Sequence, residues 1–170
     1  MRKIGIVAFA FGKPSLIRSN RIIAGITAKK AMEDNAPIFT QEDIQFPEEL
    51  NLSVTYIKDK YGKPPSTLQI AKKAVKWAEA NFFENLIVVA AGPHMWRCLR
   101  DIRRVAREEA GAWYFGAEIY PHPGMCFYKK EDWFCMDSTQ PWTATEKEWQ
   151  KRDWAIQFMP WWLYKRMAAG

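Results

Sequence analysis

His94 and Arg97 lie three residues apart in the stretch AAGPHMWRCLR, residues 90–100. This stretch follows the apolar run NLIVVAA and opens a predicted helix, so both side chains come just after a strand ends. An arginine in the first turn of a helix is unfavourable by ~0.3 to 1 kcal/mol unless an anion offsets it. An imidazole with an unperturbed pKa of about 6.5 beside that anion could donate a hydrogen bond or transfer a proton. The pair therefore predicts a site for an anionic ligand.

One glycine and two basic residues lie at comparable positions after the first predicted strand. Gly12 and Lys13 follow the apolar run IGIVAFAF, and Arg21 lies early in the next predicted helix. Arg21 repeats the unfavourable placement of Arg97. A phosphorylated metabolite could therefore use Lys13, Arg21 and Arg97 together.

Several familiar motifs are excluded by their spacing. Ser66 and Gln69 match a capping box, which explains the serine without a ligand. The string GKPPST lacks the first glycine and the spacing of a P-loop, and the sequence contains neither G-x-G-x-x-G nor G-x-S-x-G. The spacing of His122, Cys126 and Cys135 fits no usual zinc pattern. We therefore predict no metal site, no dinucleotide dehydrogenase and no ordinary α/β-hydrolase.

The elements that must position these residues alternate between strands and helices. Strands are predicted at 4–11, 36–40, 52–57, 85–91 and 112–120, with helices at 19–35, within 62–85, and from 92 onward. Continuous apolar strands require helices on both faces of a parallel sheet. The prediction is an α/β, Rossmann-like, doubly wound sheet of about five mainly parallel strands. In the common order 3-2-1-4-5, the runs 4–9 and 86–91 are central neighbours, and ligands bind beyond their carboxyl ends.

Apolar spacing predicts which helix faces are buried. The predicted faces are Ile22, Ile23, Ile26 and Met32; Leu68, Ala71, Val75 and Ala78; and Met95, Leu99, Ile102 and Val105 or Ala106. Ser19 or Asn20 is the expected N-cap of the first helix.

The chain from residue 121 onward differs in composition from the preceding residues, because it is rich in tryptophan and proline. We expect this extension, 121–170, to pack onto the edge of the sheet through a helix that is interrupted at Pro160. Trp149, Trp154 and Phe158 are the expected anchors. Its charges are of mixed sign and lack the basic face of an interfacial helix, so we do not expect it to lie on a membrane.

Composition sets broad limits on fold and partner. With 170 residues and 48% hydrophobic content, the chain is expected to form a single domain over 1–170, with its core at 4–120. A formal charge of +6 favours anionic partners. Three cysteines without a signal peptide indicate the cytoplasm, and no apolar run reaches the ~20 residues that a membrane span needs.

These residues together resemble the YdcF/SanA/ElyC-like family, a bacterial domain family. The most specific match is an apolar strand, a short loop and His-Met-x-Arg leading into a helix, which covers His94, Met95 and Arg97. Less specifically, Gly12 corresponds to the family's glycine loop and Arg21 to its first-helix arginine. The resemblance spans roughly residues 4 to 120, and Ser66 and Thr67 correspond to its Ser/Thr element.

The resemblance implies a Rossmann-like fold that binds nucleotide-type ligands such as S-adenosylmethionine. Arg97 would bind the carboxylate of that ligand, and Ser66 and Thr67 its ribose hydroxyls. The second-strand loop departs from the family's Ser-Gly-Gly, because this chain has Thr40 at its first position, and an expected acidic residue is replaced at Gln69-Ile70. These departures lead us to expect that the chain binds the family's class of ligand without catalysing the same reaction.

Three kinds of function stay open. The first is a module that binds an anionic or nucleotide-like small molecule. The second is a transferase or phosphate-handling hydrolase with His94 as general acid or base. The third is nucleic-acid binding through the arginine-rich segment RCLRDIRRVAR, although those charges also suit a solvated helix face. The missing acidic residue favours the binding module.

Overall fold

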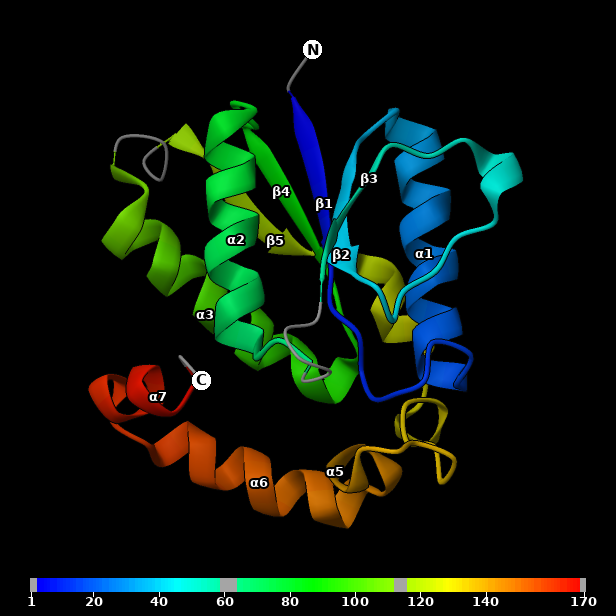
Figure 1. Ribbon diagram of the computed structural model, residues 1–170, viewed down its shortest axis with the longest axis vertical. Coiled ribbons are helices and arrows are strands. Elements are labelled where there is room, and N and C mark those ends of the chain that lie inside the picture. Colours follow the sequence, from blue (N-terminus) through cyan, green and yellow to red (C-terminus); the bar gives the residue numbers. More distant parts are fainter. Residues whose placement is uncertain (1–2, 59–63, 112–115, 169–170) are drawn as a thin grey trace.

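Five parallel strands form one sheet in a computed structural model that describes residues 3–58, 64–111 and 116–168 (Figure 1). The sheet has the order β3-β2-β1-β4-β5, which confirms the predicted doubly wound α/β fold. The strands are β1 (Ile4–Ala8), β2 (Ile38–Gln41), β3 (Val54–Ile57), β4 (Asn85–Val89) and β5 (Glu118–Pro121).

The two longest apolar runs lie at the centre of the sheet, as predicted. β1 and β4 pair in parallel from Ile4 opposite Asn85 to Ala8 opposite Val89. The Phe9 N–H donates to the Val89 carbonyl at 2.8 Å, so the two strands end side by side. The loops that follow β1 and β4 therefore start at the same edge of the sheet.

Helices cover both faces of the sheet (Figure 1). α2 (Thr67–Ala80) and α3 (Gly92–Glu109) pack on one face, and α1 (Arg18–Asp34) packs on the other. The predicted capping box opens α2: the Ser66 hydroxyl accepts from the Gln69 N–H, and the Gln69 side chain accepts from the Ser66 N–H. The predicted apolar face of α2 is buried throughout.

The start of α1 differs from the prediction. Its N-cap is Ile17, which makes no side-chain cap, whereas Ser19 and Asn20 lie inside the helix and are buried. The Ser19 hydroxyl donates to the Phe11 carbonyl, and the Asn20 side chain accepts from the Phe11 N–H. Both residues hold the loop between β1 and α1 instead of capping. Of the predicted apolar face, Ile23 is buried and Ile22 and Ile26 are partly buried. Met32 is 53% exposed, because the buried face of α1 continues through Thr27, Ala28 and Ala31.

The fifth strand begins later than predicted. β5 starts at Glu118, and of the predicted strand 112–120 the residues 112–115 lie outside the described residues. Short helical turns lie between and after the strands: η1 (Glu48–Leu50), η2 (Pro123–Phe127) and η3 (Lys130–Asp132).

The extension ends in α5 (Pro141–Ala144), α6 (Glu146–Phe158) and α7 (Trp161–Ala168), and the helix breaks at Pro160 as predicted. Trp149 is a buried anchor, but Trp154 and Phe158 are 66% and 72% exposed, so those two predictions are wrong. α6 lies across the carboxyl ends of the strands (Figure 1), not along the edge of the sheet. No helix in the described ranges is long and apolar enough to cross a membrane.

A buried polar contact fastens α7 to α3. The Tyr164 hydroxyl donates to the carboxylate of Asp101, which is fully buried and also accepts from Arg100. Trp161 Nε1 donates to Glu108 at 2.6 Å farther along α3. Burial raises the pKa of Asp101, while Arg100 and Tyr164 act against that rise. The carboxylate therefore depends on both donors.

Tyr164→Phe should lower the free energy of unfolding by about 1.5 to 3 kcal/mol, because it removes a donor from a buried carboxylate. Urea denaturation measures this loss. Tyr128→Phe is the matched control, since Tyr128 is 37% exposed and should change stability by less than about 0.5 kcal/mol. Equal losses in the two variants would contradict this role of Tyr164.

Candidate functional site

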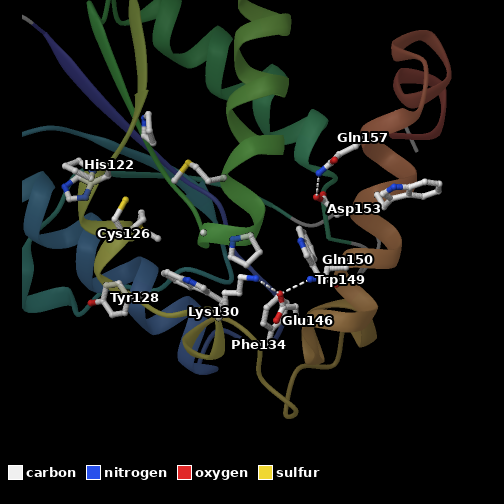
Figure 2. Close-up of a pocket in the computed structure, with 18 residues that line it drawn as sticks. His122, Cys126, Tyr128, Lys130, Phe134, Glu146, Trp149, Gln150, Asp153 and Gln157 are labelled. Carbon is white, nitrogen blue, oxygen red and sulfur yellow. Dashed lines mark hydrogen bonds and ion pairs between the residues drawn. The ribbon is translucent and has the colours of Figure 1, made fainter.

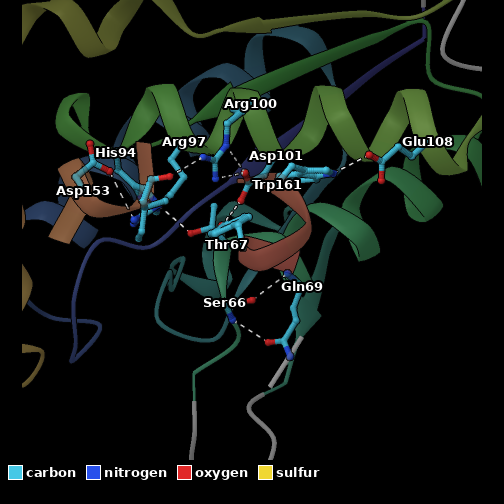
Figure 3. A network of polar contacts seen from close by, with 12 residues as sticks. Ser66, Thr67, Gln69, His94, Arg97, Arg100, Asp101, Glu108, Asp153 and Trp161 are labelled. Carbon is cyan, nitrogen blue, oxygen red and sulfur yellow. Dashed lines mark hydrogen bonds and ion pairs between the residues drawn. The ribbon is translucent and has the colours of Figure 1, made fainter. Parts of the chain in front are cut away.

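Two pockets lie at the carboxyl ends of the strands, and Trp149 of α6 lines both of them. The aromatic pocket, beside β5, has a volume of about 780 Å³ and includes Trp133 and Phe134 (Figure 2). The Arg97 pocket, beyond β1 and β2, has a volume of about 920 Å³ and includes Gly12, His94 and Arg97. Figure 3 shows the polar contacts around Arg97. The Arg97 pocket is the predicted ligand site.

Gly12 lies where the loop after β1 meets the extension. Its φ of +96° belongs to the left-handed region that favours glycine. A Cβ at this position would lie 2.7 Å from the Ser138 hydroxyl and 2.8 Å from the Thr143 hydroxyl. The Thr139 N–H also donates to the Lys13 carbonyl at 2.9 Å. Glycine is needed here because the extension packs directly on the loop.

Five of the predicted residues line the Arg97 pocket: Gly12, Ser66, Thr67, His94 and Arg97. The loops after β1 and β4 therefore converge as predicted. The Ser66 hydroxyl is already engaged, because it donates to the Ala168 carbonyl at 2.7 Å and accepts from the Gln69 N–H. Ser66 thus joins the start of α2 to the end of α7.

Three predicted residues do not line this pocket. Lys13 forms an ion pair with Asp43 at 3.8 Å beside it. Arg21 is exposed on α1. Thr40 is fully buried, and its hydroxyl donates to the Ala8 carbonyl at 3.0 Å, so it joins β2 to β1. The predicted cluster of Lys13, Arg21 and Arg97 is therefore not brought together.

Arg97 is buried, at 6% exposure, in the first turns of α3. Its guanidinium lies 4.7 Å from the ring centroid of Trp149. Its nearest carboxylate is Asp153, at 3.6 Å from Arg97 Nη1, which is an ion pair beyond ordinary hydrogen-bond distance. Among the described residues, Arg97 Nε has no hydrogen-bond partner. A buried cation is thus only partly satisfied by the protein itself.

His94 contacts Thr67 across the start of two helices (Figure 3). Its Nε2 lies 3.1 Å from the Thr67 hydroxyl, and its ring packs edge-on against Trp149 and Phe9. Burial, followed by the charges of Arg97 and Arg152, holds the pKa of His94 well below 6.5. The imidazole therefore stays neutral at a lower pH than the unperturbed ring that the sequence led us to expect.

The charge around the Arg97 pocket is mainly positive. Its described lining includes one carboxylate, Asp43, and five basic residues: Lys58, Lys72, Lys73, Arg97 and Arg152. Lys72 also pairs with Glu109 at 3.1 Å. The excess of positive charge favours an anionic ligand.

Sequence reasoning missed residues that reach the site from elsewhere in the chain. Gln41 lines the pocket and accepts from the Ala10 N–H at 2.8 Å. Arg152 lies 4.0 Å from the Trp142 ring, and Asp153 faces Arg97. A buried tryptophan four residues before Asp153 was the available signal, because i and i+4 share one face of a helix.

In the described ranges, no three His, Cys, Asp or Glu side chains are placed to hold a metal ion. Comparison with protein-family models and with curated proteins finds no match. The resemblance to the YdcF/SanA/ElyC-like family therefore stays a prediction from residues 94–97 and their surroundings.

The lowered pKa of His94 makes stability depend on pH. An unfolded histidine takes up a proton below about pH 6.5, but the folded imidazole does not until a lower pH, so stability falls as the pH falls. Between about pH 7.5 and pH 5.5 the wild type should lose about 1 kcal/mol more than His94→Gln does. Urea denaturation at both pH values measures the difference, and equal losses would show that His94 titrates normally.

Proposed function

We propose that the Arg97 pocket binds an anionic, nucleotide-like small molecule. The observation that carries this proposal is the buried guanidinium of Arg97, whose Nε has no partner in the described structure. Arg97 follows β4, beside the loop after β1, and this point of reversal in the strand order is where open α/β sheets bind ligands. The positive lining supports the same class of ligand.

Asp153 is an incomplete partner for Arg97. A charge-assisted bond between a guanidinium and a carboxylate is normally about 2.7 to 2.9 Å long. The 3.6 Å separation from Asp153 exceeds this, and the second Asp153 oxygen accepts from Gln157 at 3.0 Å. A carboxylate or phosphate of the ligand would bind Arg97 at the shorter distance.

S-adenosylmethionine is one candidate within this class. Its carboxylate would bind Arg97, and a ribose hydroxyl would bind the side chain of Thr67. The predicted second contact from Ser66 is disfavoured, because that hydroxyl already donates to Ala168. A nucleotide would instead place its phosphate at Arg97 and Arg152.

Arg97→Ala should weaken binding of AMP or S-adenosylmethionine, whichever binds the wild type, by ten- to a hundredfold. This corresponds to a charge-assisted bond of about 1.5 to 3 kcal/mol. Titration calorimetry measures the affinity after a thermal-shift screen that also includes glucose 6-phosphate.

Two variants control this experiment. Arg104→Ala should bind as the wild type does, because Arg104 is exposed on α3 and lies against Trp161. Asp153→Asn should strengthen binding, since it removes the carboxylate that competes for Arg97. An Arg97→Ala variant that keeps full affinity would place the ligand elsewhere.

A phosphate- or acyl-transferring activity is a second candidate, favoured by the contact between Thr67 and His94. The Thr67 Oγ1 would form the bond to phosphorus or to the acyl carbon while its proton moves to His94 Nε2. The leaving alcohol would then take that proton as its bond to phosphorus or to the acyl carbon breaks. Water or another acceptor would next attack the Thr67 ester and give its proton to His94 Nε2, which would return it to the Thr67 oxygen as that ester bond breaks. Burial lowers the pKa of His94 most, and an anionic substrate would offset only the further lowering by the charges of Arg97 and Arg152.

Thr67→Val should reduce hydrolysis of p-nitrophenyl phosphate or p-nitrophenyl acetate by about a hundredfold or more, because the nucleophile is lost. Thr55→Val, on the exposed side of β3, should leave the rate unchanged. An absorbance assay follows the release of p-nitrophenol. If the wild type hydrolyses neither compound, or if the two variants behave alike, the binding module is the better description.

The arginines of α3 favour a small molecule over nucleic acid. Arg100 binds Asp101 and lies 4.4 Å from the Tyr164 ring, and Arg103 donates to the Ile119 carbonyl. These contacts turn the charges toward the protein.

The cysteines at 98, 126 and 135 are free thiols, which fits a reducing compartment such as the cytoplasm.

A further inference from the structure

The aromatic pocket is a second cavity that the proposed function does not use. It lies between the start of α3, the turns after β5 and the inner side of α6 (Figure 2). Met95, Met125, Trp133, Phe134 and Trp149 form its apolar part. Its volume of about 780 Å³ falls within the range of small-molecule sites.

We propose that the aromatic pocket binds an uncharged aromatic compound that carries a hydroxyl or carbonyl group. The aromatic lining supplies the apolar surface on which such a ring is buried and stacked. The proposal does not rest on the function proposed for the Arg97 pocket.

Most of the charge at the aromatic pocket is already paired, which favours an uncharged ligand. Lys130 and Glu146 form an ion pair at 2.8 Å, and Gln150 donates to the same Glu146 oxygen (Figure 2). Asp153 faces Arg97 and accepts from Gln157. A charged ligand would have to break one of these pairs or lose its hydration without compensation.

His122 supplies a polar group for recognition. It lines the pocket, and its Nδ1 accepts from the Gly124 N–H at 3.0 Å. In the neutral ring the proton therefore lies on Nε2, which is a donor. In the proposed complex, a hydroxyl or carbonyl oxygen of the ligand would accept from this donor.

The native thiols allow a direct test of occupancy. Cys126 lines the aromatic pocket and is exposed, whereas Cys135 is partly exposed and lies outside the lining. Cys98 is fully buried, so its thiol should stay unreacted whether the ligand is present or absent. Alkylation by iodoacetamide can be followed at each cysteine by peptide mass spectrometry.

With 2-naphthol as the probe at ten times its dissociation constant, alkylation of Cys126 should slow by about tenfold, because only about a tenth of the pockets stay empty. Alkylation of Cys135 should keep its rate. Equal slowing at both cysteines, or no slowing at Cys126, would overturn the proposal.

The charge requirement is tested with two matched probes. 2-Naphthalenesulfonate and (2-naphthylmethyl)trimethylammonium carry the same ring with a negative or a positive charge. We expect 2-naphthol to bind at least about tenfold more tightly than either, measured by quenching of tryptophan fluorescence. Tighter binding of a charged probe would overturn the proposal of an uncharged ligand.

Two cysteine variants locate the probe. Cys126→Phe adds a ring to the lining of the aromatic pocket and should weaken 2-naphthol binding by about tenfold or more, whereas Cys135→Phe should not. Thermal unfolding confirms that both variants fold. Cys126→Phe should leave AMP binding intact, and saturating AMP should not displace 2-naphthol, so a failure at one pocket is distinguished from a failure at the other. Displacement of 2-naphthol by AMP would place the probe in the Arg97 pocket.

Discussion

The guanidinium of Arg97, buried beyond the carboxyl ends of the strands, is the constraint around which the rest of the structure is arranged. Arg97 is carried into the interior by α3, because its neighbour Cys98 and the later residue Ile102 pack in the core. A buried guanidinium is costly unless other groups compensate for its lost hydration. Trp149 and Asp153, some fifty residues later in the chain, supply part of that compensation. The extension therefore contributes side chains to the candidate site.

This arrangement changes how the carboxyl ends of the strands are used. In an open doubly wound sheet they face solvent, whereas here α6 lies across them (Figure 1). The inner side of α6 is narrow, because Trp149 and Asp153 are its only buried residues within the described helix. That narrow contact divides the space into a basic pocket and an aromatic pocket. The two linings therefore differ in charge although one helix borders both.

The state of His94 follows from the same buried charge. Burial and the nearby arginines keep its imidazole neutral, so its contact with Thr67 is a hydrogen bond between neutral groups. This neutral pair of Thr67 and His94 could hydrogen-bond a ligand without any proton transfer. Proton transfer would require the negative charge of a substrate beside Arg97, which links the binding and enzymatic descriptions of the site.

Local chemistry in the sequence was enough to predict the parallel strands, the helices that cover them and the start of α2, because continuous apolar runs and a capping box act over short distances. The order of the strands was taken from the common doubly wound pattern, and the structure has that order. Local chemistry also placed His94 and Arg97 in one pocket. Only the tertiary structure decided which side chains complete that pocket. Ser19 and Asn20 hold a loop instead of capping a helix, and the extension brings Asp153 to Arg97, since contacts between distant segments depend on packing and not on local spacing.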